Sequence, residues 1–260
     1  MNKYKPNNIY NVDCYEAIKG IPDKSIDLVY IDIPYLIDHG GGGHSKLAQR
    51  INKINKIDLD SISKGIDYSI FDELVRVMKY IYIYIWCSKE QILDIMKIFI
   101  DKYNCRYNLL VWCKSNPIPA TNNVWLPDLE YCLVFKEKGA PRYNDGYELK
   151  SKWYVSPINK NDKELYEHPT VKPLNLVKRH ILHSTKPNDI VLDCFMGSGT
   201  TAVACKETGR RYIGFEIDEE YYKIAVNRLN GISQKDIKNK EKGIISIFDF
   251  IEQEKEEWNF

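Results

Sequence analysis

Short apolar runs alternate along this chain with longer stretches in which apolar residues recur every three or four positions. The runs that predict strands are Ile9–Asp13, Ile26–Asp32, Tyr80–Trp86, Tyr107–Trp112, Tyr131–Phe135, Ile190–Asp193 and Tyr212–Glu216. The periodic stretches predict helices over Tyr15–Gly20, Ser69–Lys79, Lys89–Tyr103, Pro173–Ser184, Thr200–Thr208 and Glu219–Leu229. Because strands and helices alternate, we expect an α/β fold with a mostly parallel sheet and helices on both faces.

Two polar stretches interrupt this alternation. Leu36–Ser69 begins with a run rich in glycine and histidine and then becomes basic, and Gly139–Glu167 is rich in tyrosine, lysine and asparagine. Irregular segments of this length inside an α/β domain usually serve as lids or binding loops. We therefore expect both stretches to be irregular and to carry recognition. The tail after Asn230 has no assigned role.

Composition narrows the class of protein. The 260 residues fit one large α/β domain, and the seven cysteines include no C-x-x-C pair, which predicts reduced and buried thiols. No apolar run reaches the roughly 18 residues that a membrane span needs, and the polar N-terminus lacks an apolar signal segment. We therefore expect a cytoplasmic protein that acts without a membrane.

Residues 189–202, DIVLDCFMGSGTTA, read as a strand, a glycine turn and the start of a helix. Gly197 and Gly199 allow positive φ and close approach of a ligand to the backbone. The next residues, Thr200 and Thr201, are expected to cap the helix. About twenty residues after the turn, Glu216 ends the following strand, where a carboxylate can accept both ribose hydroxyls of a nucleoside. The pattern predicts a nucleoside site.

A nicotinamide dinucleotide would give a similar pattern, but two details count against it. Asp193 stands directly before the loop, where it would repel a pyrophosphate, and the loop lacks a third glycine. An acidic residue in that place suits a ligand that carries an ammonium group. S-adenosylmethionine has an ammonium, a sulfonium and a ribose, and it has no phosphate.

Residues 192–201, LDCFMGSGTT, resemble the first motif of amino-methyltransferases that act on DNA, commonly L-D-P-F-x-G-S-G-T-T. Cys194 replaces the usual proline. Gly214–Glu216 resembles the next motif of that family, and His168–Pro173 resembles its H-P-T-x-K-P segment. Together the three segments identify the chain as similar to these enzymes.

The resemblance implies a site for S-adenosylmethionine. Thr170 and Lys172 would reach its methionine carboxylate. Asn11–Cys14 resembles the family's N-x-D-C/A segment, whose carboxylate lies beside the cofactor's adenine, although Asp13 also suits a helix cap. The implied cofactor residues are Asp13, Thr170, Lys172, Asp193, Phe195, Gly197, Ser198, Gly199, Thr200, Thr201 and Glu216.

A second motif ends an earlier apolar strand. Residues 32–35, DIPY, resemble the family's D-P-P-Y tetrapeptide, with Ile33 in place of the first proline. An exocyclic base amine is a poor nucleophile because its lone pair is delocalised into the ring. Asp32 and a backbone carbonyl near Ile33 can accept its two hydrogens and free the lone pair. Pro34 would stiffen the loop, and Tyr35 would stack on a flipped-out base.

The catalytic motif precedes the glycine loop, an order that resembles the permuted β class of these enzymes. On this resemblance, residues 1–230 form one Rossmann-like methyltransferase domain, and 231–260 form a C-terminal extension. The domain would comprise a catalytic half at 1–135, an inserted target-recognition region at 136–167 and a cofactor-binding half at 168–230. Residues 112–119 and Glu130–Tyr131 resemble the segment that lines the pocket for the flipped base.

The resemblance implies site-specific methylation of double-stranded DNA. Adenine N6 is favoured over cytosine N4 because Asp32 stands first in the tetrapeptide. Methylation of RNA or protein, and an inactive DNA- or cofactor-binding module, remain as alternatives. A homodimer and a cognate restriction endonuclease are left open as partners.

Positions 41–57 contain no acidic residue. The cations there recur at three- and four-residue steps, so that a helix would place them on one side: Lys46, Arg50, Lys53 and Lys56. We expect this segment, hinged at glycines 40–43, to close on DNA phosphates. A solvated helix face is the alternative.

Overall fold

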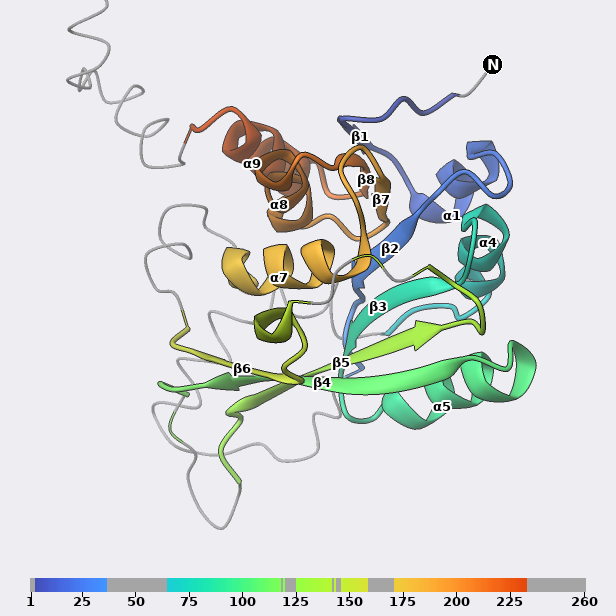
Figure 1. Cartoon of the computed structure of the whole chain (residues 1–260). Helices are drawn as coiled ribbons and strands as arrows, with labels where there is room; N and C mark the ends of the chain where they lie inside the picture. The colour runs from blue at the N-terminus through green and yellow to red at the C-terminus, as the bar shows by residue number, and fades with distance from the viewer. Residues whose placement is uncertain are drawn as a thin grey trace, which may run out of the picture.

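The computed structural model describes residues 3–36, 65–117, 119, 125–141, 143, 146–158 and 171–232. Eight strands form one sheet in the order β1-β8-β7-β2-β3-β5-β4-β6 (Figure 1). The strands are β1 Asn8–Asn11, β2 Leu28–Asp32, β3 Tyr82–Cys87, β4 Arg106–Lys114, β5 Leu129–Lys136, β6 Trp153–Ser156, β7 Ile190–Asp193 and β8 Arg211–Glu216. Among them, β5 alone runs antiparallel to its neighbours, so the prediction of a mostly parallel sheet is confirmed.

Helices cover both faces of the sheet, as predicted. One face carries α1 Cys14–Ala17, α4 Ile70–Val77 and α5 Ile92–Lys97, and the other carries α7 Leu174–Ser184, α8 Thr200–Thr208 and α9 Glu219–Leu229 (Figure 1). Short helical turns lie at η1 Ile18–Gly20, η2 Ile98–Lys102 and η3 Tyr147–Leu149. The result is a three-layer arrangement with the sheet in the middle.

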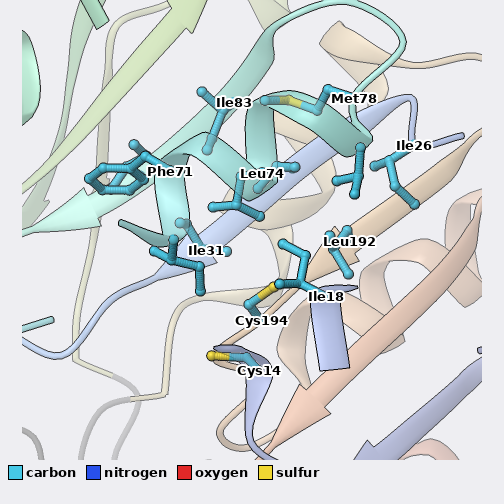
Figure 2. Packing of buried hydrophobic residues seen from close by; sticks show 14 of the residues in the cluster. Cys14, Ile18, Ile26, Ile31, Phe71, Leu74, Met78, Ile83, Leu192 and Cys194 are labelled. Carbon is cyan, nitrogen blue, oxygen red and sulfur yellow. The ribbon is translucent and has the colours of Figure 1, made fainter. Parts of the chain in front are cut away.

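The central strand β2 shows why its sequence is apolar at nearly every position. Val29 and Ile31 point to the layer of α1, α4 and α5, whereas Leu28 and Tyr30 point to the layer of α7 and α8. Successive side chains of a strand face opposite sides, so a strand covered on both faces buries all of them. Figure 2 shows the first of these layers, with Phe71 of α4 in the same cluster as Ile31.

The second layer contains a buried polar network. The Tyr30 hydroxyl accepts a hydrogen bond from Trp86 Nε1 at 2.8 Å and lies 3.2 Å from His180 Nδ1. Burial lowers the pKa of His180 to about 3, so its imidazole is neutral. These bonds hold the Trp86 ring, whose centroid lies 5.1 Å from Lys172 Nζ.

Most elements begin or end a few residues away from the predicted bounds, and two differences are larger. The helix predicted over Lys89–Tyr103 begins only at Ile92, and its last turn is the π-helical η2. The expectation that Gly139–Glu167 is irregular is wrong for β6, which pairs in parallel with the edge of β4. Its four residues alternate between exposed and half-buried, so backbone pairing rather than an apolar run defines this strand.

All seven cysteines are free, and all but Cys113 are buried. They pack as small apolar side chains, as the sequence predicts. Within the described residues, no helix combines the length and the apolarity that crossing a bilayer requires.

Candidate functional site

A pocket of about 570 Å³ opens where β2, β7 and β8 end. The carboxyl ends of neighbouring parallel strands meet at one edge of a sheet, which is where α/β proteins bind ligands. The pocket volume lies within the ordinary range for small-molecule sites. Of the predicted cofactor and catalytic residues that the structure describes, all but Gly199 line it: Asp13, Asp32, Pro34, Tyr35, Lys172, Asp193, Phe195, Gly197, Ser198, Thr200, Thr201 and Glu216.

The glycine turn between β7 and α8 has the backbone that the sequence predicts. Gly197 has a φ of 49° and Gly199 a φ of 80°, both in the left-handed region that favours glycine. A Cβ on Gly199 would also lie 3.0 Å from the Cα of Ala225 in α9. Gly199 therefore allows both the turn and the close packing of α9, although it does not line the pocket.

The expectation that Thr200 and Thr201 cap α8 is wrong. The residue before the helix is Gly199, and no side chain caps the first turn. Thr200 Oγ1 instead accepts a hydrogen bond from Arg228 Nη1 at 2.8 Å, and the carbonyl of Ser198 accepts from the same nitrogen at 3.2 Å. Arg228 is buried, so its guanidinium needs such acceptors, and it ties the loop to α9.

Two buried carboxylates face the pocket from the ends of β7 and β8. Asp193 Oδ1 accepts from the backbone N–H of Phe195 at 3.0 Å, and burial raises the pKa of Asp193 to about 7. Glu216 accepts from the N–H of Gly197 at 2.7 Å and of Asp218 at 2.9 Å. A carboxylate has about four acceptor positions, so Glu216 retains capacity for ligand hydroxyls.

Asp13 has one of its two suggested roles in the structure. Its side chain accepts from the N–H of Tyr15 at 2.8 Å and caps α1. Because Asp13 also lines the pocket, the helix cap places the carboxylate at the site. Its contact with a cofactor remains a prediction.

The DIPY segment leaves β2 under several restraints. The N–H of Ile33 donates to the carbonyl of Trp86 at 3.2 Å, and Gln91 Nε2 donates to the carbonyl of Pro34 at 3.0 Å. Ile33 itself is buried in the layer of α1, α4 and α5. Core packing and these bonds therefore hold the loop at the position where the family motif has proline.

Lys172 lies at the centre of the catalytic motif. Its Nζ is 2.6 Å from Asp32 Oδ2, 2.9 Å from Glu130 Oε2 and 3.1 Å from the Tyr35 hydroxyl. Lys114 Nζ contacts the other oxygen of Glu130 at 2.7 Å. The contact of Lys172 with the methionine carboxylate remains a prediction, and in the structure its ammonium lies against Asp32. Glu130 could be located only through the resemblance of its segment to the lining of a base pocket.

Burial and charge set the ionisation of this cluster. Burial raises the pKa of Asp32, and Lys172 opposes the shift. Burial would raise the pKa of Glu130 as well, but the ammonium groups of Lys172 and Lys114 outweigh it and lower that pKa to about 2. Burial disfavours the charged form of Lys172, yet Asp32 and Glu130 keep its pKa above the ordinary value. Asp32 Oδ1 is buried and has no hydrogen-bond partner among the described residues.

Some predicted site residues cannot be placed. Thr170 lies outside the described residues, and so do the four cations of the basic segment: Lys46, Arg50, Lys53 and Lys56. Their assigned contacts remain predictions.

Comparison with known proteins agrees with the fold and the site. The PvuII DNA methyltransferase (cytosine-N4-specific) has a similar fold, with a TM-score of 0.68 at 18% identity over 94% of this chain and 96% of that structure. The M1.HpyAVI–SAM complex gives a TM-score of 0.63 at 27% identity over 85% of this chain and 99% of that structure. The architecture is therefore that of the Rossmann-like DNA methyltransferases.

The family is shown by sequence. The model of the N6/N4 family described as "DNA methylase" matches residues 26–227. The chain is 30% identical to the type II methyltransferase M2.LlaDCHI of Lactococcus lactis subsp. cremoris, over 85% of this chain and 88% of that protein. It is 31% identical to M2.DpnII of Streptococcus pneumoniae, over 84% and 87%. The chain belongs to the N6/N4 DNA methylase family, which confirms the resemblance seen in the motifs.

Proposed function

We propose that this chain transfers a methyl group from S-adenosylmethionine to N6 of an adenine flipped out of double-stranded DNA. The observation that carries the proposal is the position of Asp32 Oδ1. This buried acceptor has no partner among the described residues and shares one pocket with the glycine turn and Glu216. A buried acceptor of this kind fits a donor that arrives with the substrate.

The pocket residues fit the cofactor. Glu216 offers acceptors for the ribose hydroxyls, Asp193 offers a carboxylate for the ammonium, and Gly197 lets a ligand approach the backbone. We assign the remaining contacts to Asp13, Phe195, Ser198, Thr200 and Thr201, which line the same pocket. When bound, S-adenosylmethionine supplies an electrophilic methyl group on its sulfonium.

The chain's own contribution is to hold and activate the base. Asp32 Oδ1 accepts one hydrogen of the exocyclic amine, and the carbonyl of Ile33 accepts the other, so the nitrogen lone pair leaves conjugation with the ring. The carboxylate then stabilises the positive charge that develops on nitrogen. The ring of Tyr35 stacks on the base, and the bonded carbonyl of Pro34 keeps the segment in place.

We assign DNA contact to the segments outside the pocket. The basic segment formed by Lys46, Arg50, Lys53 and Lys56 contacts phosphates, and the region at 136–167 reads the target sequence. Two relatives are named type II methyltransferases, which supports a cognate restriction endonuclease as a functional partner.

The test is a product analysis. The protein is incubated with labelled S-adenosylmethionine and unmethylated double-stranded DNA, RNA or protein, and the labelled nucleosides are identified by mass spectrometry. We expect N6-methyladenine from DNA. N4-methylcytosine would overturn the choice of base, label in RNA or protein would overturn the choice of substrate, and cofactor binding without any transfer would indicate an inactive module.

A further inference from the structure

Four charged side chains form a continuous series of ion pairs that ends at Asp32, the proposed acceptor of the target amine. Lys114 contacts Glu130 at 2.7 Å, Glu130 contacts Lys172 at 2.9 Å, and Lys172 contacts Asp32 at 2.6 Å. Lys172 and Glu130 are both largely buried, with side-chain exposures of 6% and 13%. Charges buried to this degree are retained only when they are paired, so these four side chains act as one unit.

The hydrogen-bonding capacity of Lys172 is fully used. An ammonium has three donors, and three acceptors lie within hydrogen-bond distance: Asp32 Oδ2, Glu130 Oε2 and the Tyr35 hydroxyl. A lysine is usually a flexible point charge, but three simultaneous bonds fix the position of this one. Binding the methionine carboxylate of a cofactor would require Lys172 to give up at least one of these bonds.

The sheet fixes the end of this ion-pair series that lies furthest from Asp32. Lys114 is the last residue of β4, and its backbone N–H donates to the carbonyl of Asp128 at 2.7 Å. Glu130 lies in β5 opposite Trp112 of the same strand pair. Because both partners project from adjacent strands, the Glu130 carboxylate has a rigid support from which to hold Lys172.

We propose that Lys172 is a positioning residue for Asp32, and that Glu130, held by Lys114, fixes Lys172 in that position. Lys172 occupies Asp32 Oδ2 and thereby leaves Oδ1 as the oxygen that accepts the target amine. This inference rests on the proposed role of Asp32 as the acceptor. It assigns a function to Glu130 and Lys114, and it moves Lys172 from the cofactor to the catalytic motif.

Lys172 also fixes the ring on which the base stacks. Its Nζ donates to the Tyr35 hydroxyl at 3.1 Å, so the free rotation of the Tyr35 side chain is restricted. A Tyr35→Phe variant keeps the stacking face and loses the contacts of the hydroxyl, which are this bond from Lys172 and a hydrogen bond to Glu130 Oε2 at 3.4 Å. Its loss of activity measures the contribution of these contacts separately from stacking.

The charges in the cluster predict opposite effects of two substitutions on the pH profile. The groups that act on Asp32 are Lys172, Glu130 and Tyr35, and Asp32 in turn acts on Cys87, Cys132 and Asp193. Lys172 is the cation that lowers the pKa of Asp32, and Glu130 raises it. Lys172→Met should therefore move the acid limb of kcat to higher pH, and Glu130→Gln should move it to lower pH.

The experiment uses the full chain with S-adenosylmethionine and unmethylated double-stranded DNA. We expect Lys172→Met to lower kcat by about a hundredfold, the scale of a lost transition-state contact, with the cofactor Kd nearly unchanged. Glu130→Gln should lower kcat on the order of tenfold, because it weakens one charge-assisted bond to the ammonium. Lys178→Met is the matched control, since Lys178 pairs with Glu207 away from the pocket.

Calorimetric cofactor binding shows whether each variant is folded, and Lys172→Arg, which keeps the charge, replaces Lys172→Met if that variant does not fold. A normal kcat and acid limb with a cofactor Kd at least about tenfold weaker would overturn the inference and return Lys172 to the methionine carboxylate. Asp32→Ala separates the two proposals. If Asp32→Ala is inactive and Lys172→Met is normal, only this inference fails, whereas an active Asp32→Ala means that the proposed role of Asp32 as the acceptor fails.

Discussion

Glu216 Oε2 accepts a hydrogen bond from the backbone N–H of Gly197 at 2.7 Å, so the carboxylate that ends β8 also holds the glycine turn that follows β7. The two residues are 19 positions apart, and the strands that lead to them, β7 and β8, are adjacent and parallel. A residue proposed to bind the ribose therefore also shapes the loop beside it.

Replacing Glu216 by Ala should weaken S-adenosylmethionine binding by about 1.5–3 kcal/mol, the scale of hydrogen bonds to a charged group. Glu216→Gln retains one carbonyl acceptor and should lose less. Isothermal calorimetry measures both, and DNA affinity without cofactor serves as the control because it should not change. An unchanged cofactor affinity in Glu216→Ala would exclude the ribose role.

Asp193 predicts a pH dependence of stability. Its pKa rises to about 7 in the folded chain, above roughly 3.9 in the unfolded chain, so the folded state binds the extra proton between these values. The free energy of unfolding should therefore fall as pH rises from about 4 to about 7 and should level off above that. Asp193→Asn should remove this slope and should be more stable than the unsubstituted chain at about pH 8, on the order of 2–4 kcal/mol.

Denaturant titrations at several pH values measure this effect. The same group should make cofactor binding pH-dependent, since an ionised Asp193 attracts the ammonium and a protonated one does not. Affinity should increase as pH rises through about 7 in the unsubstituted chain and stay flat in Asp193→Asn. Parallel stability profiles for the two proteins would show that Asp193 does not titrate in this range.

Gly199 and Gly209 form a matched pair for testing the turn. Both have left-handed backbone, with φ of 80° and 72°, but a Cβ would meet Ala225 at 3.0 Å only at Gly199 and would meet nothing within 4 Å at Gly209. Gly209→Ala should cost about 1–2 kcal/mol of stability from backbone strain. Gly199→Ala should cost about 2–4 kcal/mol, because overpacking against α9 adds to the strain. Equal losses in urea unfolding would mean that the close contact is relieved without cost.

The basic segment is tested by salt dependence. If Lys46, Arg50, Lys53 and Lys56 all contact phosphates, replacing them by Ala should reduce the slope of log affinity against log salt by about 0.9 per contact, or nearly four in total. Binding should weaken equally for all DNA sequences, because phosphate contacts carry no sequence information. An unchanged slope would assign the four cations to a solvated helix face.

The pocket could be predicted because each of its motifs is local. The turn around Gly197 and the DIPY segment each follow a buried strand. Because the carboxyl ends of neighbouring parallel strands meet at one edge of a sheet, the fold class alone predicts that the two motifs lie close together. The contact between Lys172 and Asp32 spans 140 positions and depends on how the start of α7 packs against β2. Sequence spacing contains no signal for such a contact.

The remaining errors have similar physical causes. The predicted threonine cap does not form because Thr200 Oγ1 accepts a hydrogen bond from the buried guanidinium of Arg228. Arg228 lies in α9, 28 positions further along the sequence. Strand β6 was missed because it is paired at an exposed edge and lacks an apolar run. In both cases a long-range partner decides the local structure, and local pattern alone does not identify that partner.

The central claim is that Asp32 accepts the target amine, and single-turnover methylation by Asp32→Ala tests it most directly. The measurement follows the formation of N6-methyladenine in double-stranded DNA with enzyme in excess, beside calorimetric cofactor binding. We predict a rate at least about a hundredfold lower, the scale of one lost transition-state electrostatic contact, with a much smaller change in cofactor affinity. Methylation by Asp32→Ala at a near-normal rate would contradict the assignment of Asp32.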